Sequence, residues 1–224
     1  MTSSTQALST PSRSATPTLR HEASFFVRQV TPRIITPLLL LSVAIRASIP
    51  GWAWADAAVV IALIAAQPFV EWLIHVYILH WKPKQVMGRT IDPLVARKHR
   101  EHHADPKRTE WIFVPLPVLA KAIPATSLAV LLLAPIDLAM TAISAGLAIL
   151  LTYEWTHYLI HSRYQPRTRL YRYIWRAHRL HHFKNENYWF GVTNPMGDHV
   201  LGTFPAKDAV ETSPTARSLH AGGV

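Results

Sequence analysis

Hydrophobic residues are concentrated in four runs, at residues 34–49, 57–81, about 114–133 and 138–160. A helix needs about 20 apolar residues to cross the hydrocarbon core of a bilayer. The second run is long enough, whereas the first is short and contains Arg46. We expect this arginine to reach the membrane interface from near a helix end. A buried or tilted interfacial helix is the alternative for the first run, and four crossings are the preferred interpretation.

Both ends of the chain lack this pattern. Residues 1–33 are rich in Ser, Thr, Pro and Arg, which predicts a disordered, solvated tail. They contain no apolar segment followed by a small-residue cleavage site, so we do not expect a conventional signal peptide. Residues 206–224 are expected to form a loose tail. The predicted fold is therefore all-α, with one membrane-embedded domain over residues 34–205 and a histidine-rich helical cap.

Composition supports a membrane protein. Half of the 224 residues are hydrophobic, yet the net charge is +10. Soluble domains seldom combine these properties, whereas a membrane protein places apolar spans in lipid and basic loops on the cytoplasmic face. Nucleic-acid binding is the other common reason for a basic chain. It is not expected here, because the basic residues flank apolar spans and form no nucleic-acid-binding motif.

The distribution of charge predicts the orientation in the membrane. Residues 82–110 contain eight Lys or Arg, and residues 162–184 are also strongly basic. The connections 50–56 and 134–137 contain neither. Because excess Lys and Arg marks the cytoplasmic side, both termini and the histidine-rich segments are expected there.

Histidine is the compositional anomaly. The chain has 13 histidines, as many as Asp and Glu together, and no cysteine. The absence of thiolates leaves imidazole and carboxylate as the strong metal ligands. Ten of the histidines fall into four groups, which are His75 with His80; His99, His102 and His103; His157 with His161; and His178, His181 and His182.

The spacing within these groups has a structural meaning. Residues three or four apart share one face of a helix, so His99 and His103 should point together with His102 beside them. The pair His157 and His161 can likewise aim two imidazoles at one region. Five residues separate His75 from His80, which places them about 140° apart on a regular helix. The helix is therefore expected to end, bulge or unwind between them.

The order of the groups repeats along the chain. A span ends in a histidine pair, and a HxxHH group follows 17 or 19 residues later. The dipeptide Glu-Trp precedes each pair, at residues 71–72 and 154–155. This repeat predicts two halves of one site, whose ten imidazoles exceed the capacity of one ion but suit two. A structural zinc would favour cysteine, which the chain lacks. A pair of metals held by histidine alone instead suits dioxygen-activating redox chemistry.

The remaining candidate residues are expected to have supporting roles. His21 and His220 lie in the tails and should be solvated, and His199 is expected to be structural or to support a ligand. Glu71, Glu154 and Asp198 are candidates to orient ligand imidazoles. Ordinary capping or pairing is an equally good interpretation of each carboxylate.

These motifs resemble the fatty acid hydroxylase superfamily, which also contains sterol desaturases and carotenoid hydroxylases. The resemblance covers about residues 60–205 and rests on HVYILH, HREHH, HYLIH and HRLHH. The stretch at residues 181–203, with FGVT and a later Gly-Thr, is most similar to fatty acid 2-hydroxylases. The implied metal ligands are His75, His80, His99, His102, His103, His157, His161, His178, His181 and His182. Of these, His102 and His181 are expected to be essential for catalysis.

The resemblance also implies an activity. It is the dioxygen-dependent hydroxylation of a membrane lipid, with a fatty acyl chain as the expected substrate. Two iron ions are the implied cofactors, although zinc can occupy such sites in isolated protein. No cytochrome b5 domain is found in this chain, so a separate ferredoxin or cytochrome is expected as the electron donor.

Several alternatives remain open at this point. Carotenoid hydroxylation, sterol oxidation and desaturation belong to the same superfamily. A metal transporter or metal-binding scaffold is the alternative from another class. Transporters place their ligands near the bilayer midplane, whereas these histidines lie at and beyond the span ends.

Overall fold

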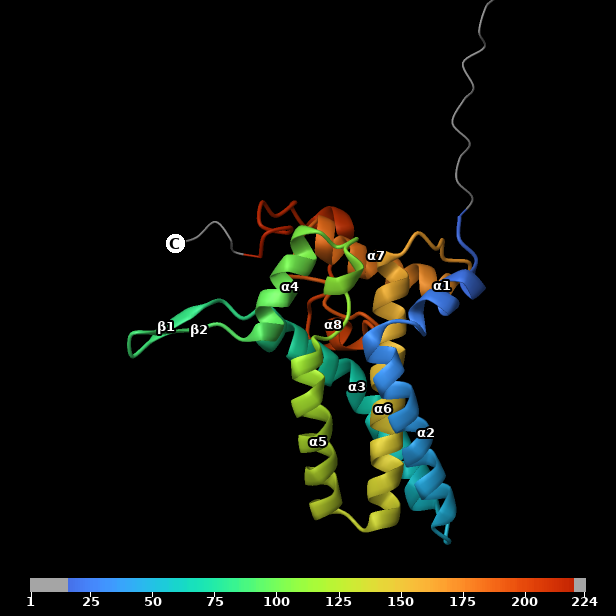
Figure 1. Cartoon of the computed structure of the whole chain (residues 1–224). Coiled ribbons are helices and arrows are strands. Elements are labelled where there is room, and N and C mark those ends of the chain that lie inside the picture. The colour runs from blue at the N-terminus through green and yellow to red at the C-terminus, as the bar shows by residue number, and fades with distance from the viewer. Residues whose placement is uncertain (1–15, 220–224) are drawn as a thin grey trace, which may run out of the picture.

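Four long helices stand side by side and carry a smaller helical cap at one end (Figure 1). The computed structural model describes residues 16–219. The long helices are α2 (Val30–Ser48), α3 (Trp54–Ile74), α5 (Leu116–Leu133) and α6 (Ile136–His161). All four are long and apolar enough to cross a membrane. The all-α fold with four candidate spans is therefore confirmed.

The cap is built from shorter elements that connect or follow the spans. A π-helix, His75–Leu79, continues α3, and α4 (Leu94–Ala104) leads to a 3₁₀ turn at Thr109–Trp111. After α6 come α7 (Arg169–Phe183), α8 (Met196–Val200) and a 3₁₀ turn at Lys207–Ala209. A small antiparallel hairpin of β1 (Lys84–Val86) and β2 (Arg89–Ile91) was not expected from the sequence.

Helix α6 is central to the bundle and packs against α2, α3 and α5. Ile35, Leu119 and Leu147 form a buried cluster that joins α2, α5 and α6. The opposite faces of the outer helices are apolar and exposed, with Ile61 66% and Leu132 76% accessible. Exposed aliphatic side chains on long helices suit a lipid environment.

A buried ion pair ties three spans together at the end opposite the cap. Arg46 on α2 is only 1% exposed, and its guanidinium lies 2.8 Å from the Asp56 carboxylate on α3. Thr141 on α6 donates a hydrogen bond to the same carboxylate at 2.5 Å. Arg46 does not extend outward from the bundle, because Asp56, Thr141 and the Ile49 carbonyl provide partners inside it.

The described part of the predicted N-terminal tail is largely helical. Helix α1 (Leu19–Phe26) is capped by the Thr18 side chain, and α2 begins at Val30, before the apolar run itself. Phe26 is buried and packs edge-on against Trp155, while the Tyr158 hydroxyl donates to the buried Glu22 carboxylate. These contacts order a polar segment that its composition alone assigns to a tail. Residues 1–15 lie outside the described part of the chain.

The segment expected to be a loose C-terminal tail also packs on the cap as far as residue 219. Ala216 and Leu219 are buried. The Ser213 amide donates to the Lys184 carbonyl at 2.7 Å, and Thr215 donates to the buried Glu186 carboxylate at 2.5 Å. Scattered small and hydroxyl-bearing residues make these contacts, so no hydrophobic period marks the segment.

We predict that Asp56→Ala lowers the thermal unfolding midpoint in detergent. The substitution leaves the Arg46 charge without its carboxylate partner inside the bundle, which is destabilising. Removing both charges in Arg46→Leu/Asp56→Leu should restore part of the loss. Asp137→Ala, in the other short turn, is the matched control. Equal midpoints for Asp56→Ala and the wild type would contradict this role.

Candidate metal centre

The π-helix aligns the two histidines that a regular helix would separate. The His80 amide donates to the His75 carbonyl at 3.0 Å, which is the i→i+5 bond of a π-turn. The two imidazole ring centres are 5.0 Å apart. The expected departure from α-helical geometry between His75 and His80 is thus confirmed.

The ten histidines converge in two adjoining groups inside the cap. Within each group the ligand atoms lie within 4.8 Å of one another. The first cluster is His75, His80, His99, His103 and His181, and the second cluster is His102, His157, His161, His178 and His182. The clusters are in contact, since the rings of His103 and His182 stack with centres 4.1 Å apart.

Each HxxHH group is divided between the two clusters. On α4, His99 and His103 face the first cluster, while His102 faces the second. On α7 the arrangement is reversed, because His178 and His182 face the second cluster and His181 faces the first. Both clusters therefore depend on α4 and α7 together, and neither half of the sequence completes a cluster alone.

The spacing of the nitrogen atoms suits a shared ion. In the first cluster the Nε2 atoms of His75 and His99 are 3.1 Å apart, and those of His103 and His181 are 3.2 Å apart. In the second cluster the Nε2 atoms of His161 and His178 are 3.1 Å apart. Nitrogens that surround one ion at about 2.1 Å are themselves about 3.0–3.4 Å apart.

Hydrogen bonds to the backbone determine which nitrogen faces the interior. The Nδ1 atoms of His103 and His181 lie 2.8 Å from the carbonyls of Ala216 and Tyr188. A carbonyl only accepts, so both Nδ1 atoms carry the proton and both Nε2 atoms present lone pairs. These two Nε2 atoms are 3.2 Å apart. Two facing lone pairs repel unless a cation lies between them, and this arrangement therefore fits a metal ion.

Burial keeps these imidazoles neutral. It lowers the pKa of His103 to about 3, and it lowers the pKa values of His99 and His181 well below their usual range. In the second cluster burial likewise lowers the pKa values of His102 and His178, and neighbouring imidazoles add to the effect. Neutral imidazole is the form that binds metal.

A carboxylate-supported loop orients His75. The Nδ1 atom of His75 donates to the Phe190 carbonyl at 2.6 Å. Asp198 accepts from the Phe190 and Gly191 amides, and Glu71 accepts from the Val192 and Thr193 amides. Gly191 is required there, because a Cβ would lie 2.8 Å from the Asn194 carbonyl oxygen. The two carboxylates thus hold the segment whose carbonyl positions the imidazole.

Glu154 has the equivalent role in the second cluster. It accepts from the Val114 amide at 2.9 Å, and the nearby Ile112 carbonyl accepts from His157 Nδ1 at 2.9 Å. Glu71, Glu154 and Asp198, the candidates for orienting imidazoles, thus act through the backbone and do not bond the rings directly. Backbone carbonyls accept from the rings, and the carboxylates hold the backbone. Sequence reasoning missed these carbonyls because backbone groups carry no residue signature.

The other histidines lie apart from the clusters. His21 is exposed on α1. The His199 ring lies with Nε2 2.5 Å from the Tyr173 hydroxyl and stacks on Phe204, which indicates a structural role. His220 lies outside the described residues.

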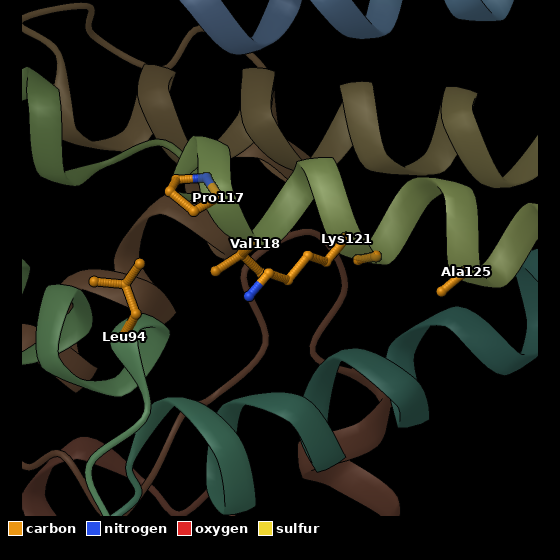
Figure 2. A pocket seen from close by; sticks show the side chains of 6 residues that line it. Leu94, Pro117, Val118, Lys121 and Ala125 are labelled. Atoms are coloured by element: carbon orange, nitrogen blue, oxygen red, sulfur yellow. The ribbon is translucent and has the colours of Figure 1, made fainter.

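A small hollow and a larger groove lie beside the clusters. The hollow has a volume of about 30 Å³ and is lined by His99 of the first cluster, His157 of the second, and mainly apolar residues including Leu79 and Tyr153. The groove, about 420 Å³, lies between α4 and α5 (Figure 2). It is lined by Leu94, Pro117, Val118, Lys121, Ala122 and Ala125. Lys121, whose side chain extends past Val118, is its one charged residue.

The fold and the paired histidine clusters are those of a membrane protein with two groups of imidazoles that could hold metal. The sequence matches the family described as Fatty acid hydroxylase over residues 60–203. The chain therefore belongs to the fatty acid hydroxylase family. This match contains all ten clustered histidines.

Characterised relatives are similar over much of this chain. It is 28% identical over 141 residues to a dihydroceramide fatty acyl 2-hydroxylase of Arabidopsis thaliana, covering 63% of this chain and 58% of that protein. It is 30% identical over 146 residues to fatty acid 2-hydroxylase of Homo sapiens, covering 64% and 38%. The chain thus spans little more than half of the first relative and less of the second.

A solved structure shares the fold. Full-length Scs7p, of which only the hydroxylase domain is visible, superposes with a TM-score of 0.68 at 20% sequence identity. The match covers 82% of this chain and 69% of that one. At this identity the likeness supports the fold alone.

Proposed function

We propose that this protein is a di-iron oxygenase that hydroxylates a fatty acyl chain of a membrane lipid. The observation that carries this proposal is the pair of five-histidine clusters at the ends of membrane-spanning helices, with a hollow that both clusters reach. Membership of the fatty acid hydroxylase family supports the same reaction. The 2-hydroxylase names of the relatives favour an acyl chain over a sterol or carotenoid.

The ten clustered histidines are the proposed ligands, five for each of two iron ions. Imidazole nitrogen suits iron, and no cysteine is present to favour zinc. Bound iron would supply the reduction of dioxygen and the attack on an unactivated C–H bond. His102 and His181 are proposed to be essential because each is the one histidine of its HxxHH group that joins the other cluster.

The remaining residues would place the substrate and exclude water. The hollow between His99 and His157 has room for a molecule the size of dioxygen. Its apolar lining would keep water from the reacting carbon. The groove begins at Leu94, next to Val95 of the hollow, and continues along α5. An acyl chain suits its aliphatic walls, and the Lys121 ammonium suits an acidic headgroup.

The reaction requires electrons from another protein. Hydroxylation of one C–H bond by dioxygen consumes two electrons and two protons and releases water. The exposed Arg169, Arg172 and Arg176 lie on α7, whose buried face carries His178 and His182. No acidic residue occurs between 162 and 185. An acidic ferredoxin or cytochrome would therefore dock within about one helix diameter of the clusters.

The cap is proposed to lie on the cytoplasmic side. Its connections are rich in Lys and Arg, while the turns at 50–56 and 134–137 contain none. Both termini would share this side.

Gently purified protein should contain about two iron or zinc ions per chain, and chelation should lower its thermal midpoint. Metal that binds only the folded state at 100 times its Kd stabilises it by about 2.7 kcal/mol. His181→Ala should lose metal, whereas His199→Ala should retain it, as elemental analysis would show. A folded protein that contains no metal, and whose thermal unfolding midpoint does not change when Fe²⁺ is added, would rule out the site.

Incubation with reductant, a donor protein and isotopically labelled dioxygen should place one labelled oxygen in a hydroxyl near the carboxyl end of the acyl chain. Mass spectrometry of extracted lipids measures the label. Ala122→Phe in the groove should slow the reaction on long chains without loss of metal. Leu132→Phe, farther along α5, is the matched control.

Other products would change the assignment. Label acquired from water would exclude an oxygenase. A labelled carotenoid or sterol would preserve the chemistry and overturn the substrate, and a double bond without label would indicate a desaturase.

Cysteine labelling should reveal the orientation, because the chain has no native cysteine. Ala104→Cys, exposed at the end of α4, should react only with a reagent on the cytoplasmic side. Ala53→Cys in the first turn should react only from outside. Labelling of position 104 from outside intact cells would reverse the proposed orientation.

A further inference from the structure

The hairpin of β1 and β2 projects sideways from the base of α4, near the cap end of α5 (Figure 1). Its turn is formed by Met87 and Gly88, both with positive φ (50° and 73°). Turns of this kind match the twist of paired strands. Residues 82–91 are all exposed, and Met87 is 100% exposed at the tip.

The hairpin has two chemically different faces. Lys84 pairs with Ile91 and Val86 pairs with Arg89, so one face alternates cations with aliphatic side chains. Gln85 and Thr90 form the other face and hydrogen-bond at 2.8 Å. The first face and the tip are thus both apolar and positively charged.

The base of the hairpin is fixed to the rest of the cap. The Trp81 indole donates to the Ile91 carbonyl at 3.2 Å, and the Lys84 ammonium lies 4.4 Å from the centre of the Trp81 ring. Arg100 on α4 pairs with Asp92 at 2.6 Å and donates to the Trp81 carbonyl at 3.1 Å. These bonds hold the hairpin in one direction relative to the helices.

A bilayer surface can cover the exposed apolar side chains of the hairpin and provide anions for its cations. An isolated two-stranded hairpin is only marginally stable in water, and Val86, Met87 and Ile91 are left exposed to it. The candidate span ends at Leu79, two residues before Trp81, so the hairpin begins at the lipid–water boundary. Residues 82–91 contain three cations and no acidic residue. Such segments are attracted to anionic headgroups, and Lys and Arg stems can lie along apolar surface while their charged ends reach phosphate.

We propose that the β1–β2 hairpin binds the surface of the surrounding bilayer. Its tip at Met87 enters the headgroup region, and Lys82, Lys84 and Arg89 contact anionic lipid phosphates. This lipid-binding surface is separate from the metal clusters and does not depend on the reaction proposed above.

The test uses Met87→Cys labelled with an environment-sensitive fluorophore, since no other thiol is present. The full-length protein is placed in nanodiscs of phosphatidylcholine alone or with added phosphatidylserine. We expect blue-shifted emission, and quenching by nitroxide-labelled lipid, that increase with phosphatidylserine and decrease at high salt. The labelled Thr90→Cys, on the other face, should respond less. Adding Lys82→Gln, Lys84→Gln and Arg89→Gln to the Met87→Cys protein should abolish the phosphatidylserine dependence.

Three outcomes would overturn the proposal. In the first, the emission at position 87 would stay that of a fluorophore in water in both lipid compositions. In the second, the emission would shift to the blue only at a higher protein concentration. In the third, it would shift only when an acidic protein is added. The second would assign the hairpin to contact between copies of this chain, and the third to a protein partner.

Discussion

The cap is organised around a single electrostatic problem, which is that nine buried imidazoles and the half-buried His80 lie in two groups where nitrogen lone pairs face one another. His103 and His181 show it most directly, since both commit Nδ1 to a carbonyl and leave facing Nε2 atoms 3.2 Å apart. Hydrophobic packing cannot remove that repulsion, whereas cations can. The π-helix, α4, α6 and α7 direct their imidazoles from different sides toward the centres of the two clusters. Ions at those points would join α4, α6 and α7 through their imidazoles.

The rings are held by backbone, and carboxylates hold the backbone. In one half Glu71 binds the Val192 and Thr193 amides, and the adjacent Phe190 carbonyl orients His75. In the other half Glu154 binds the Val114 amide, and Ile112 orients His157. The two Glu-Trp dipeptides noted in the sequence therefore mark equivalent supports. Each carboxylate thus lies one step away from the ring, and the carbonyl between them fixes the tautomer of the imidazole.

Much of this arrangement could be predicted because it depends on periodicity and side-chain chemistry. The four spans follow from their apolar runs, and the break between His75 and His80 follows from a spacing that no regular helix accommodates. The division of each HxxHH group could not be predicted, since it depends on how α4 and α7 face each other. The supporting carbonyl of Ala216 lies in a segment without any pattern. The burial of Arg46 could not be predicted, because it depends on how α2, α3 and α6 pack and on Thr141, which is 95 residues away.

The exchange of His102 and His181 between clusters has a consequence for biogenesis. The first cluster needs residues from 75 to 181, and the second needs residues from 102 to 182. No segment emerging from the ribosome can therefore hold a complete set of the proposed ligands until α7 has been made and docked. Metal bound by His75 and His80 before α7 has been made would occupy an incomplete site and would dissociate readily. Stable metal binding would thus require that the entire chain has folded. Metal content would therefore distinguish fully folded protein from incompletely folded protein.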